Sequence, residues 1–321
     1  MKYRAVVCRE LGTPEVLHVE ELEAPALQPG QARVKLHSCG VNFPDLLMVA
    51  GKYQFKPPLP FVPGFESAGE VIEVAEGAKV RVGDRVIFRR KTGGFAEQAV
   101  AAPNELAAFP EGYSWDEAAT YTVGVLTAYH SLATRGRLQK GETLLVTGAA
   151  GGVGMAAVAI GAHMGAQVIA AASSAEKCAA AAKAGAKHTI NTSERRVDEA
   201  VKEITGGKGV DCLYDPVGLA AEAALRSMAF GGRILLIGFA GDIPTYPANR
   251  LLIKCVTLIG VRAGEYARHF PAVRVEEAPE IERLTKVVRP HIGKTYPLEQ
   301  ASRALLDIAE RKAIGRLVLR P

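Results

Sequence analysis

The segment Thr147–Ala157, TGAAGGVGMAA, has residue types and spacing suited to holding a phosphate group. It follows an apolar run and precedes an alanine-rich amphipathic stretch, a pattern that predicts a strand, a tight turn and a helix. Backbone N–H groups at such a helix start point outward, and the helix dipole favours negative charge there. Gly151 lets the backbone approach a pyrophosphate, and Gly154 lets helix and strand pack closely. Because Ala149 replaces the first glycine of G-x-G-x-x-G, the motif alone also fits a glycine-rich turn without a ligand.

A second group of polar residues lies about 20 positions further on, where a site for NAD usually carries an acidic residue. The predicted strand 167–171 is followed by Ser173 and Ser174, and the nearest acid, Glu176, is followed by Lys177. Two hydroxyls and a lysine in place of a carboxylate suit the extra 2′-phosphate of NADP. Ser173-x-x-Glu176 also matches a helix capping box, which is compatible because the cap would fix the turn that presents the serines. We therefore expect NADPH as the cofactor.

The elements that must position these residues alternate in type. Strand-like runs alternate with alanine-rich helical segments from residue 141 to 261, which predicts a doubly wound parallel sheet. The first hundred residues instead show short β-rich runs separated by glycine and proline turns, which predicts a barrel-like domain. Helical patterns follow in the tail, which ends on a strand-like run. The predicted domains are therefore 1–118, 119–261 and a return to the first domain at 262–321.

Composition excludes several classes of function. The net charge is +5, and the 39 lysines and arginines are scattered rather than massed, which argues against a nucleic-acid surface. No apolar run approaches the ~18–20 residues of a membrane-spanning helix, and the N-terminal residues lack the apolar core of a signal peptide. The five cysteines are dispersed and form no C-x-x-C motif. We expect reduced thiols in a cytoplasmic protein that does not bind membranes.

Several motifs along the whole chain carry a resemblance to a known family. They are SCGVNFPD at 38–45, GKY at 51–53, PGFESAGEV at 63–71, VGDRV at 82–86, VGVLTAYHSL at 123–132, the TGAAGGVG turn and YDPVG at 214–218. Together they resemble the zinc-independent quinone oxidoreductases of the medium-chain dehydrogenase/reductase superfamily, whose relatives include ζ-crystallin and enoyl reductases. The resemblance implies a GroES-like barrel domain beside a Rossmann domain, and a homodimer in which the apolar edge run 255–261 joins two sheets.

The residues that bind catalytic zinc in related alcohol dehydrogenases are incomplete here. Cys39 stands where the first ligand would be and Glu66 keeps the glutamate of the G-H-E motif, but Phe65 occupies the histidine position. One thiolate and one carboxylate do not make the three-ligand site that catalytic zinc requires. We expect no metal site, which leaves hydride donation from NADPH to an acceptor that is already polarised by conjugation.

The resemblance places three residues of the first domain in the catalytic region. Asn42 matches a family asparagine near the nicotinamide ribose or substrate, although it also precedes a predicted helix and can cap it. Asp45 matches a position in the same region but is equally a first-turn carboxylate. Tyr53 matches the family's S-G-x-Y tyrosine and is our candidate proton donor or carbonyl-polarising group, with a loop aromatic as the structural alternative. Leu47 stands where bacterial quinone reductases often carry a tyrosine, which weakens the inference of quinone preference.

The remaining site residues are assigned to the cofactor. From the motifs and the resemblance, they are Thr127, Gly148, Ala150, Gly151, Gly152, Val153, Gly154, Ser173, Ser174, Lys177, Val217, Gly238, Phe239, Ala240, Arg262 and Arg316. The sequence does not decide between Lys312 and Arg316 for the last of these contacts.

The leading prediction is an NADPH-dependent reductase of quinones or α,β-unsaturated carbonyls. Two alternatives stay open: an enoyl-CoA reductase of the acryloyl-CoA type, and a crystallin-like protein that binds NADPH with little turnover. The sequence contains nothing that separates the small-molecule acceptors from one another.

Overall fold

The chain is described by a computed structural model of residues 1–321, which divides into two compact units. Unit 1 comprises Met1–Val123 and Pro290–Pro321, and unit 2 comprises Gly124–Arg289. These junctions differ from the boundaries predicted after residues 118 and 261. Helix α2 (Trp115–Tyr129) crosses the first boundary without a break. The segment from 262 to 289, with helices α8 (Ala263–His269) and α9 (Ala272–Leu284), belongs to unit 2.

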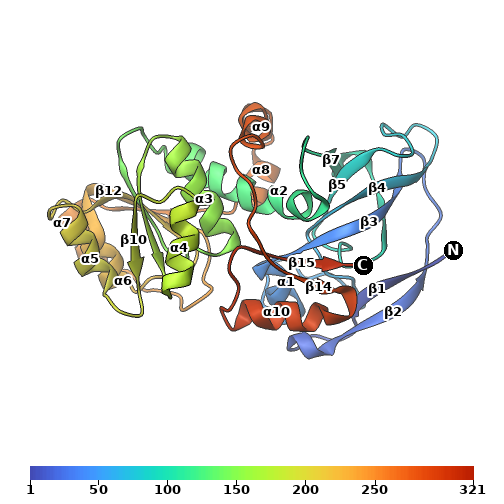
Figure 1. Ribbon diagram of the computed structural model, residues 1–321, viewed down its shortest axis with the longest axis horizontal. Coiled ribbons are helices and arrows are strands. Elements are labelled where there is room, and N and C mark those ends of the chain that lie inside the picture. The colour runs from blue at the N-terminus through green and yellow to red at the C-terminus, as the bar shows by residue number, and fades with distance from the viewer. The chain divides into compact units, whose positions relative to one another are not determined.

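Unit 1 is built on a seven-stranded sheet in the order β14-β15-β3-β4-β5-β7, with β6 paired to β3. Its strands are β3 (Ala32–Val41), β4 (Glu66–Val74), β5 (Arg85–Arg89), β6 (Gln98–Ala101), β7 (Leu106–Ala108), β14 (Ile292–Pro297) and β15 (Arg316–Arg320). The C-terminal strand β15 pairs antiparallel with β3 and parallel with β14, so the red C-terminal strands and the blue strand β3 share one sheet (Figure 1). An antiparallel pair, β1 (Lys2–Cys8) and β2 (Leu17–Glu23), and the helices α1 (Phe43–Val49) and α10 (Ala301–Ala309) complete unit 1.

Unit 2 is a six-stranded parallel sheet in the order β10-β9-β8-β11-β12-β13. Its strands are β8 (Thr143–Val146), β9 (Gln167–Ala172), β10 (His188–Asn191), β11 (Val210–Asp215), β12 (Met228–Leu236) and β13 (Thr257–Gly260). Its helices after α2 are α3 (Gly152–His163), α4 (Ala175–Lys183), α5 (Val197–Ile204), α6 (Ala221–Ser227), α7 (Ala248–Lys254), α8 (Ala263–His269) and α9 (Ala272–Leu284). The order reverses between β8 and β11, which confirms the predicted doubly wound sheet.

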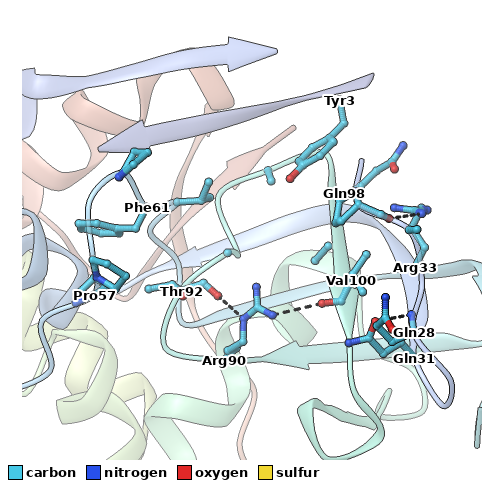
Figure 2. A pocket seen from close by; sticks show the side chains of 18 of the residues that line it. Tyr3, Gln28, Gln31, Arg33, Pro57, Phe61, Arg90, Thr92, Gln98 and Val100 are labelled. Atoms are coloured by element: carbon cyan, nitrogen blue, oxygen red, sulfur yellow. Dashed lines mark hydrogen bonds between the residues drawn. The ribbon is translucent and has the colours of Figure 1, made fainter. Parts of the chain in front are cut away.

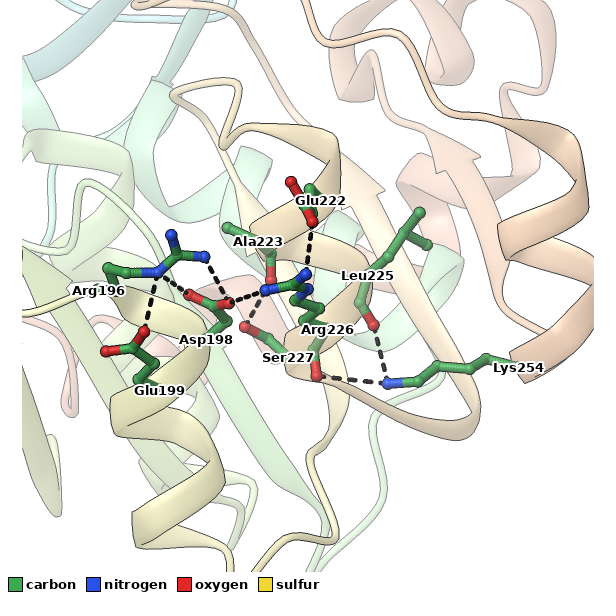
Figure 3. Close-up of polar contacts among 9 residues, drawn as sticks. All are labelled: Arg196, Asp198, Glu199, Glu222, Ala223, Leu225, Arg226, Ser227 and Lys254. Carbon is green, nitrogen blue, oxygen red and sulfur yellow. Dashed lines mark hydrogen bonds and ion pairs between the residues drawn. The ribbon is translucent and has the colours of Figure 1, made fainter.

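Side chains of two helices on this sheet are held by an ion-pair network. Asp198 of α5, whose side chain is 5% exposed, accepts from Arg196 at 2.9 Å and lies 3.7 Å from Arg226 of α6 (Figure 3). Lys254 of α7 donates to the carbonyl oxygens of Leu225 and Arg226, which lie at the C-terminal end of α6 (Figure 3). The charged side chains therefore join α5 to α6, and α6 to the end of α7.

Helix α2 continues into a π-helical turn over His130–Arg135, where Gly136 N–H donates to Ser131 O at 2.7 Å. The buried His130 ring lies 2.8 Å through Nδ1 from Glu277 of α9, and the hydroxyl of Thr134 donates to the same carboxylate. The contacts of His130 and Thr134 with Glu277 attach α9 to the π-helical turn. No helix in the structure is long and apolar enough to cross a membrane.

Candidate functional site

Arg316, Asn42 and Glu66 form a buried polar network in unit 1. The guanidinium Nη2 of Arg316 donates to Asn42 Oδ1 at 2.8 Å and to Glu66 Oε1. The other Glu66 oxygen accepts from Val123 N–H at 2.9 Å. All three side chains are nearly inaccessible, at 3% for Asn42, 1% for Glu66 and 6% for Arg316. Burial raises the pKa of the Glu66 carboxyl, and the Arg316 charge opposes this shift.

Asn42 lies between β3 and α1 with a fixed side-chain amide. Its Oδ1 accepts from Arg316, while Nδ2 lies 3.2 Å from Gly40 O and 3.3 Å from Glu66 Oε1. Asn42 is the residue before α1, but its side chain makes no capping hydrogen bond. Asn42 is nevertheless the N-cap residue of α1, and its backbone N–H donates to the Asp45 carboxylate, so the helix-cap interpretation stays open while the network orients the amide.

Asp45 holds backbone rather than presenting a free carboxylate. Its Oδ2 accepts from Asn42 N–H and its Oδ1 from Gly64 N–H, both at 2.9 Å, and the residue is fully buried. Burial raises the pKa of the carboxyl to about 7, opposed by those two backbone donors. Both carboxylate oxygens bind the backbone of the turns before α1 and before β4, which favours the first-turn interpretation of Asp45 over a catalytic role.

Tyr53 is half-buried, and its ring meets the ring of Phe65 edge to face at a centroid distance of 5.8 Å. Cys39 is fully buried, and its Sγ lies 4.0 Å from Ala96 O. Burial raises the pKa of the Cys39 thiol to about 12, so the thiolate that binds metal is strongly disfavoured there. Nowhere in residues 1–321 do three His, Cys, Asp or Glu side chains come together as a set that could hold a metal ion.

The glycine turn of unit 2 lies between β8 and α3. Gly148 has a φ of 55°, in the left-handed region, and α3 begins at Gly152 with Gly151 as its N-cap. A Cβ on Gly154 would lie 2.3 Å from Gly148 O, whereas one on Gly151 would come no closer than 3.4 Å to that atom. Gly154 is therefore needed for packing, and Gly151 leaves open space at the helix start.

Asp215, at the end of β11, positions the loop beside the glycine turn and is not among the residues expected from the sequence. Its Oδ1 accepts from Thr147 Oγ1 at 2.5 Å and from Val217 N–H and Gly218 N–H at 3.0 Å each, and its Oδ2 accepts from Leu219 N–H at 2.7 Å. One buried carboxylate thus joins the ends of the two central strands, β8 and β11. The signal was an aspartate directly after an apolar strand in YDPVG.

The loops after β11 and β12 are also joined. Ala240 N–H donates to Pro216 O at 3.3 Å, and Gly241 N–H donates to Val217 O at 2.7 Å. Phe239 is 38% exposed at the tip of the second loop. The structure thus brings Val217, Gly238, Phe239 and Ala240 to the carboxyl edge of the parallel sheet, where ligands bind in such folds.

The end of β9 carries the hydroxyls and the lysine in one cluster. Lys177 Nζ lies 3.2 Å from Ser173 Oγ, and Lys177 N–H donates to Ser174 Oγ at 3.3 Å. Ser174 is therefore the N-cap of α4, not Ser173 as the predicted capping box requires. Ser173 is left beside the ammonium group, and no carboxylate ends this strand.

The remaining residues assigned to the cofactor differ in their surroundings: Thr127, Arg262, and the two C-terminal alternatives Lys312 and Arg316. Thr127 lies half-buried in α2, and its carbonyl accepts from Ser131 Oγ at 2.5 Å. Arg262 precedes α8, with 51% of its side chain exposed and Glu265 at 3.8 Å. Lys312 pairs with Glu310 at 2.5 Å, whereas Arg316 belongs to the buried network of unit 1.

Comparisons with known proteins cover nearly the whole chain. Residues 28–111 match the alcohol dehydrogenase GroES-like domain, and residues 152–277 match the zinc-binding dehydrogenase family. Quinone oxidoreductase-like protein 2 of Bos taurus is 40% identical over 99% of this chain and 92% of its own length. A probable oxidoreductase from Mycobacterium abscessus has the same fold, with a TM-score of 0.90 and 37% identity over 100% of this chain and 99% of its own.

The quinone oxidoreductase from Thermus thermophilus, whose complex with NADPH is known, superposes with a TM-score of 0.87. It is 32% identical over 99% of this chain and 100% of its own. The coverage of both units by these relatives, together with the Rossmann turn of unit 2, shows that the chain belongs to the quinone oxidoreductase family of the medium-chain dehydrogenase/reductase superfamily.

Proposed function

We propose that this protein is an NADPH-dependent reductase that transfers a hydride to a quinone or an α,β-unsaturated carbonyl without catalytic zinc. The observation that carries the proposal is the cluster at the end of β9, where Lys177 Nζ lies 3.2 Å from Ser173 Oγ. A 2′-phosphate is attracted by this ammonium group and meets no carboxylate at the strand end. The NADPH complex of the Thermus thermophilus relative supports the same choice of cofactor.

The residues of unit 2 fit the rest of NADPH. The pyrophosphate would be held at the start of α3, where Gly151 leaves room for close approach and the N–H groups of Gly152 and Val153 are unused by the helix. Gly148 and Ala150 shape the turn beneath it. The loop residues Val217, Gly238, Phe239 and Ala240, together with Thr127 and Arg262, remain our proposal for the nicotinamide end.

The residues of unit 1 would act on the acceptor. Bound NADPH supplies the hydride, and the chain has to orient the acceptor, exclude water and stabilise the charge that develops on its carbonyl oxygen. Tyr53 is our proposed hydrogen-bond donor to that oxygen. Asn42, with its amide fixed by Arg316 and Glu66, is the proposed orienting group. A direct contact between Arg316 and the cofactor also remains a proposal.

The decisive experiment follows NADPH absorbance with a panel of quinones, enals, enones and enoyl-CoA thioesters. We expect oxidation with quinones or conjugated carbonyls, and a much lower rate with NADH. Turnover confined to enoyl-CoA thioesters would move the assignment to an enoyl thioester reductase. Tight NADPH binding without oxidation across the panel would overturn the reductase assignment in favour of a low-turnover binding protein.

The absence of zinc and the assembly need separate tests. Elemental analysis of the active protein is expected to find no stoichiometric zinc, and a ratio near one would contradict the proposal. We further propose a cytoplasmic homodimer joined along the edge strand β13. In α7, the helix that precedes β13 in the chain, Leu252 and Ile253 are 77% and 66% exposed. Sedimentation that finds only monomer at micromolar concentration would exclude this assembly.

A further inference from the structure

Unit 1 contains a cavity of about 620 Å³ that the proposed reaction does not use. It lies among β1, β6, the start of β3 and the loops around residues 55–62 and 90–93. Arg33 and Asn42 are nine positions apart along β3. At ~3.3 Å per residue, the polar end of the cavity is roughly 30 Å from the Asn42 network. The volume is in the range of small-molecule sites.

The cavity has an apolar end and a polar end. Pro57 and Phe61 lie at one end, whereas Arg33, Gln28 and Gln31 lie at the other, with Arg90 between them (Figure 2). Phe55 and several further prolines line the apolar part. No aspartate or glutamate is among the lining residues. The lining therefore offers an apolar surface and hydrogen-bond donors, and is complementary to an anion with an apolar tail.

Arg90 is fixed in orientation and pairs with one carboxylate, that of Glu105. Its Nε donates to Thr92 O at 3.0 Å and its Nη1 to Val100 O at 3.4 Å, both drawn in Figure 2. The nearest acid, Glu105, is 3.7 Å away from Nη1. Two backbone carbonyls thus hold the guanidinium in place, and the ion pair with Glu105 on the partly exposed side offsets its charge only in part. A preorganised arginine of this kind suits a carboxylate ligand.

Three further side chains add polarity beside Arg90. Arg33 is buried, with its guanidinium anchored to Glu73 at 2.7 Å and to Pro25 O at 2.9 Å. Burial raises the pKa of the Tyr3 phenol, while Arg90 and Arg33 oppose the shift, so both guanidinium groups lie within electrostatic range of its hydroxyl. The Gln98 amide is held only by a 3.6 Å contact from Nε2 to Met1 Sδ, and its Oε1 has no partner.

We propose that this cavity is a second ligand site, which binds a small monocarboxylate with an apolar tail. The carboxylate lies against Arg90 and the Tyr3 hydroxyl, and the tail lies along Phe55, Phe61 and the prolines of the 57–60 segment. The site is separate from the proposed reductase function, because it needs neither NADPH nor the Asn42 network.

The test is calorimetric titration of the full-length protein with octanoate, butanoate and octanol. Octanoate is expected to bind at least about tenfold more tightly than butanoate, because each buried methylene contributes about 0.8 kcal/mol. Octanol is expected to bind at least about tenfold more weakly than octanoate, because it lacks the charge that Arg90 recognises. Equal binding of octanol and octanoate would leave only an apolar cavity and would overturn the proposal, as would no binding of octanoate.

Variants assign the effect to the cavity. Arg90→Gln is expected to weaken octanoate binding about tenfold or more, and Tyr3→Phe should weaken it by a smaller factor while removing only a hydroxyl. Arg81→Gln is the matched control, because Arg81 is an exposed arginine of the same unit that does not line the cavity. Equal losses in Arg81→Gln and Arg90→Gln would mean non-specific charge binding. Unchanged binding in both Arg90→Gln and Tyr3→Phe would place the ligand elsewhere.

Discussion

The Nη2 atom of Arg316 lies 2.8 Å from Oδ1 of Asn42, although 274 positions separate the two residues in the chain. The same nitrogen donates to Glu66, so a single guanidinium orients the amide that we propose for the acceptor and neutralises a buried carboxylate. Stability and site geometry in unit 1 therefore depend on one side chain from the last strand.

Arg316→Met is expected to lower the free energy of unfolding by about 3–5 kcal/mol, because it leaves Glu66 buried without its counter-charge. Adding Glu66→Gln should recover most of this loss, since the amide needs no counter-charge and still accepts from Val123 N–H. Urea denaturation of the wild type, the two single variants and the double variant measures the coupling. A double variant no more stable than Arg316→Met would show that the ion pair is not the cause.

The raised pKa of Asp45 predicts that the free energy of unfolding falls as pH rises. Its folded pKa is about 7, above the unfolded value of about 3.9, so the folded state holds the proton more tightly. The stability that the protonated Asp45 carboxyl contributes to the folded state is complete below the unfolded pKa and is lost as pH rises through 7. Asp45→Asn should flatten the dependence of the unfolding free energy between pH 5 and 8, measured by urea denaturation in matched buffers. An identical slope in the variant would assign the dependence to another group.

Two glycines of the phosphate turn should respond differently to alanine. Gly154→Ala places a Cβ 2.3 Å from Gly148 O, and we expect it to cost about 1–3 kcal/mol of stability and to weaken NADPH binding. Gly151→Ala has a nearest contact of 3.4 Å and should keep its melting temperature while binding NADPH at least tenfold more weakly. Thermal unfolding and fluorescence titration separate the two effects. Normal NADPH affinity in Gly151→Ala would argue against a pyrophosphate at this turn.

Lys177→Glu tests the choice of nicotinamide cofactor. The change puts a carboxylate where the 2′-phosphate is expected, so the Kd for NADPH should rise about tenfold or more while that for NADH changes little. Lys183→Glu, at the exposed other end of α4, is the matched control for net charge. Titration of both cofactors against the three proteins gives the comparison. Equal effects of the two substitutions would leave the specificity unexplained.

The sequence predicted most elements of unit 2 but fewer of unit 1. Apolar strands alternating with alanine-rich helices are a strong local signal. The pattern predicts strands at 143–147 and 167–171 and helices at 152–164, 175–184 and 197–205, and β8, β9 and α3 to α5 form within a residue or two of these ranges. The sequence predicts a strand at 233–239, but β12 begins at Met228, because Gly231 and Gly232 look like a turn in sequence yet lie within the strand. Strand β2 was not predicted, since its LHVEELE sequence is rich in charge and suits a solvent-exposed strand.

The candidate site was predicted unevenly for a related reason. The glycine turn and the Ser173–Lys177 group are local in sequence, and their residues come together as expected. The partners of Arg316 were not predictable, because no short-range pattern joins residues 250 and 274 positions apart. Asp45 was assigned a chemical role because a buried carboxylate that binds two backbone N–H groups looks the same in sequence as one that faces a substrate.

The position of β15 between β14 and β3 has a consequence for synthesis on the ribosome. Unit 2 is one continuous stretch, whereas unit 1 needs residues 290–321 to complete its sheet. While the nascent chain emerges, β3 lacks its partner on one edge until Arg316–Arg320 has been translated, and unpaired strand edges promote aggregation. Unit 2 is complete in sequence before that moment. The order of translation therefore favours folding of the inserted unit first, and the N-terminal strands are the part that a chaperone has most reason to shield.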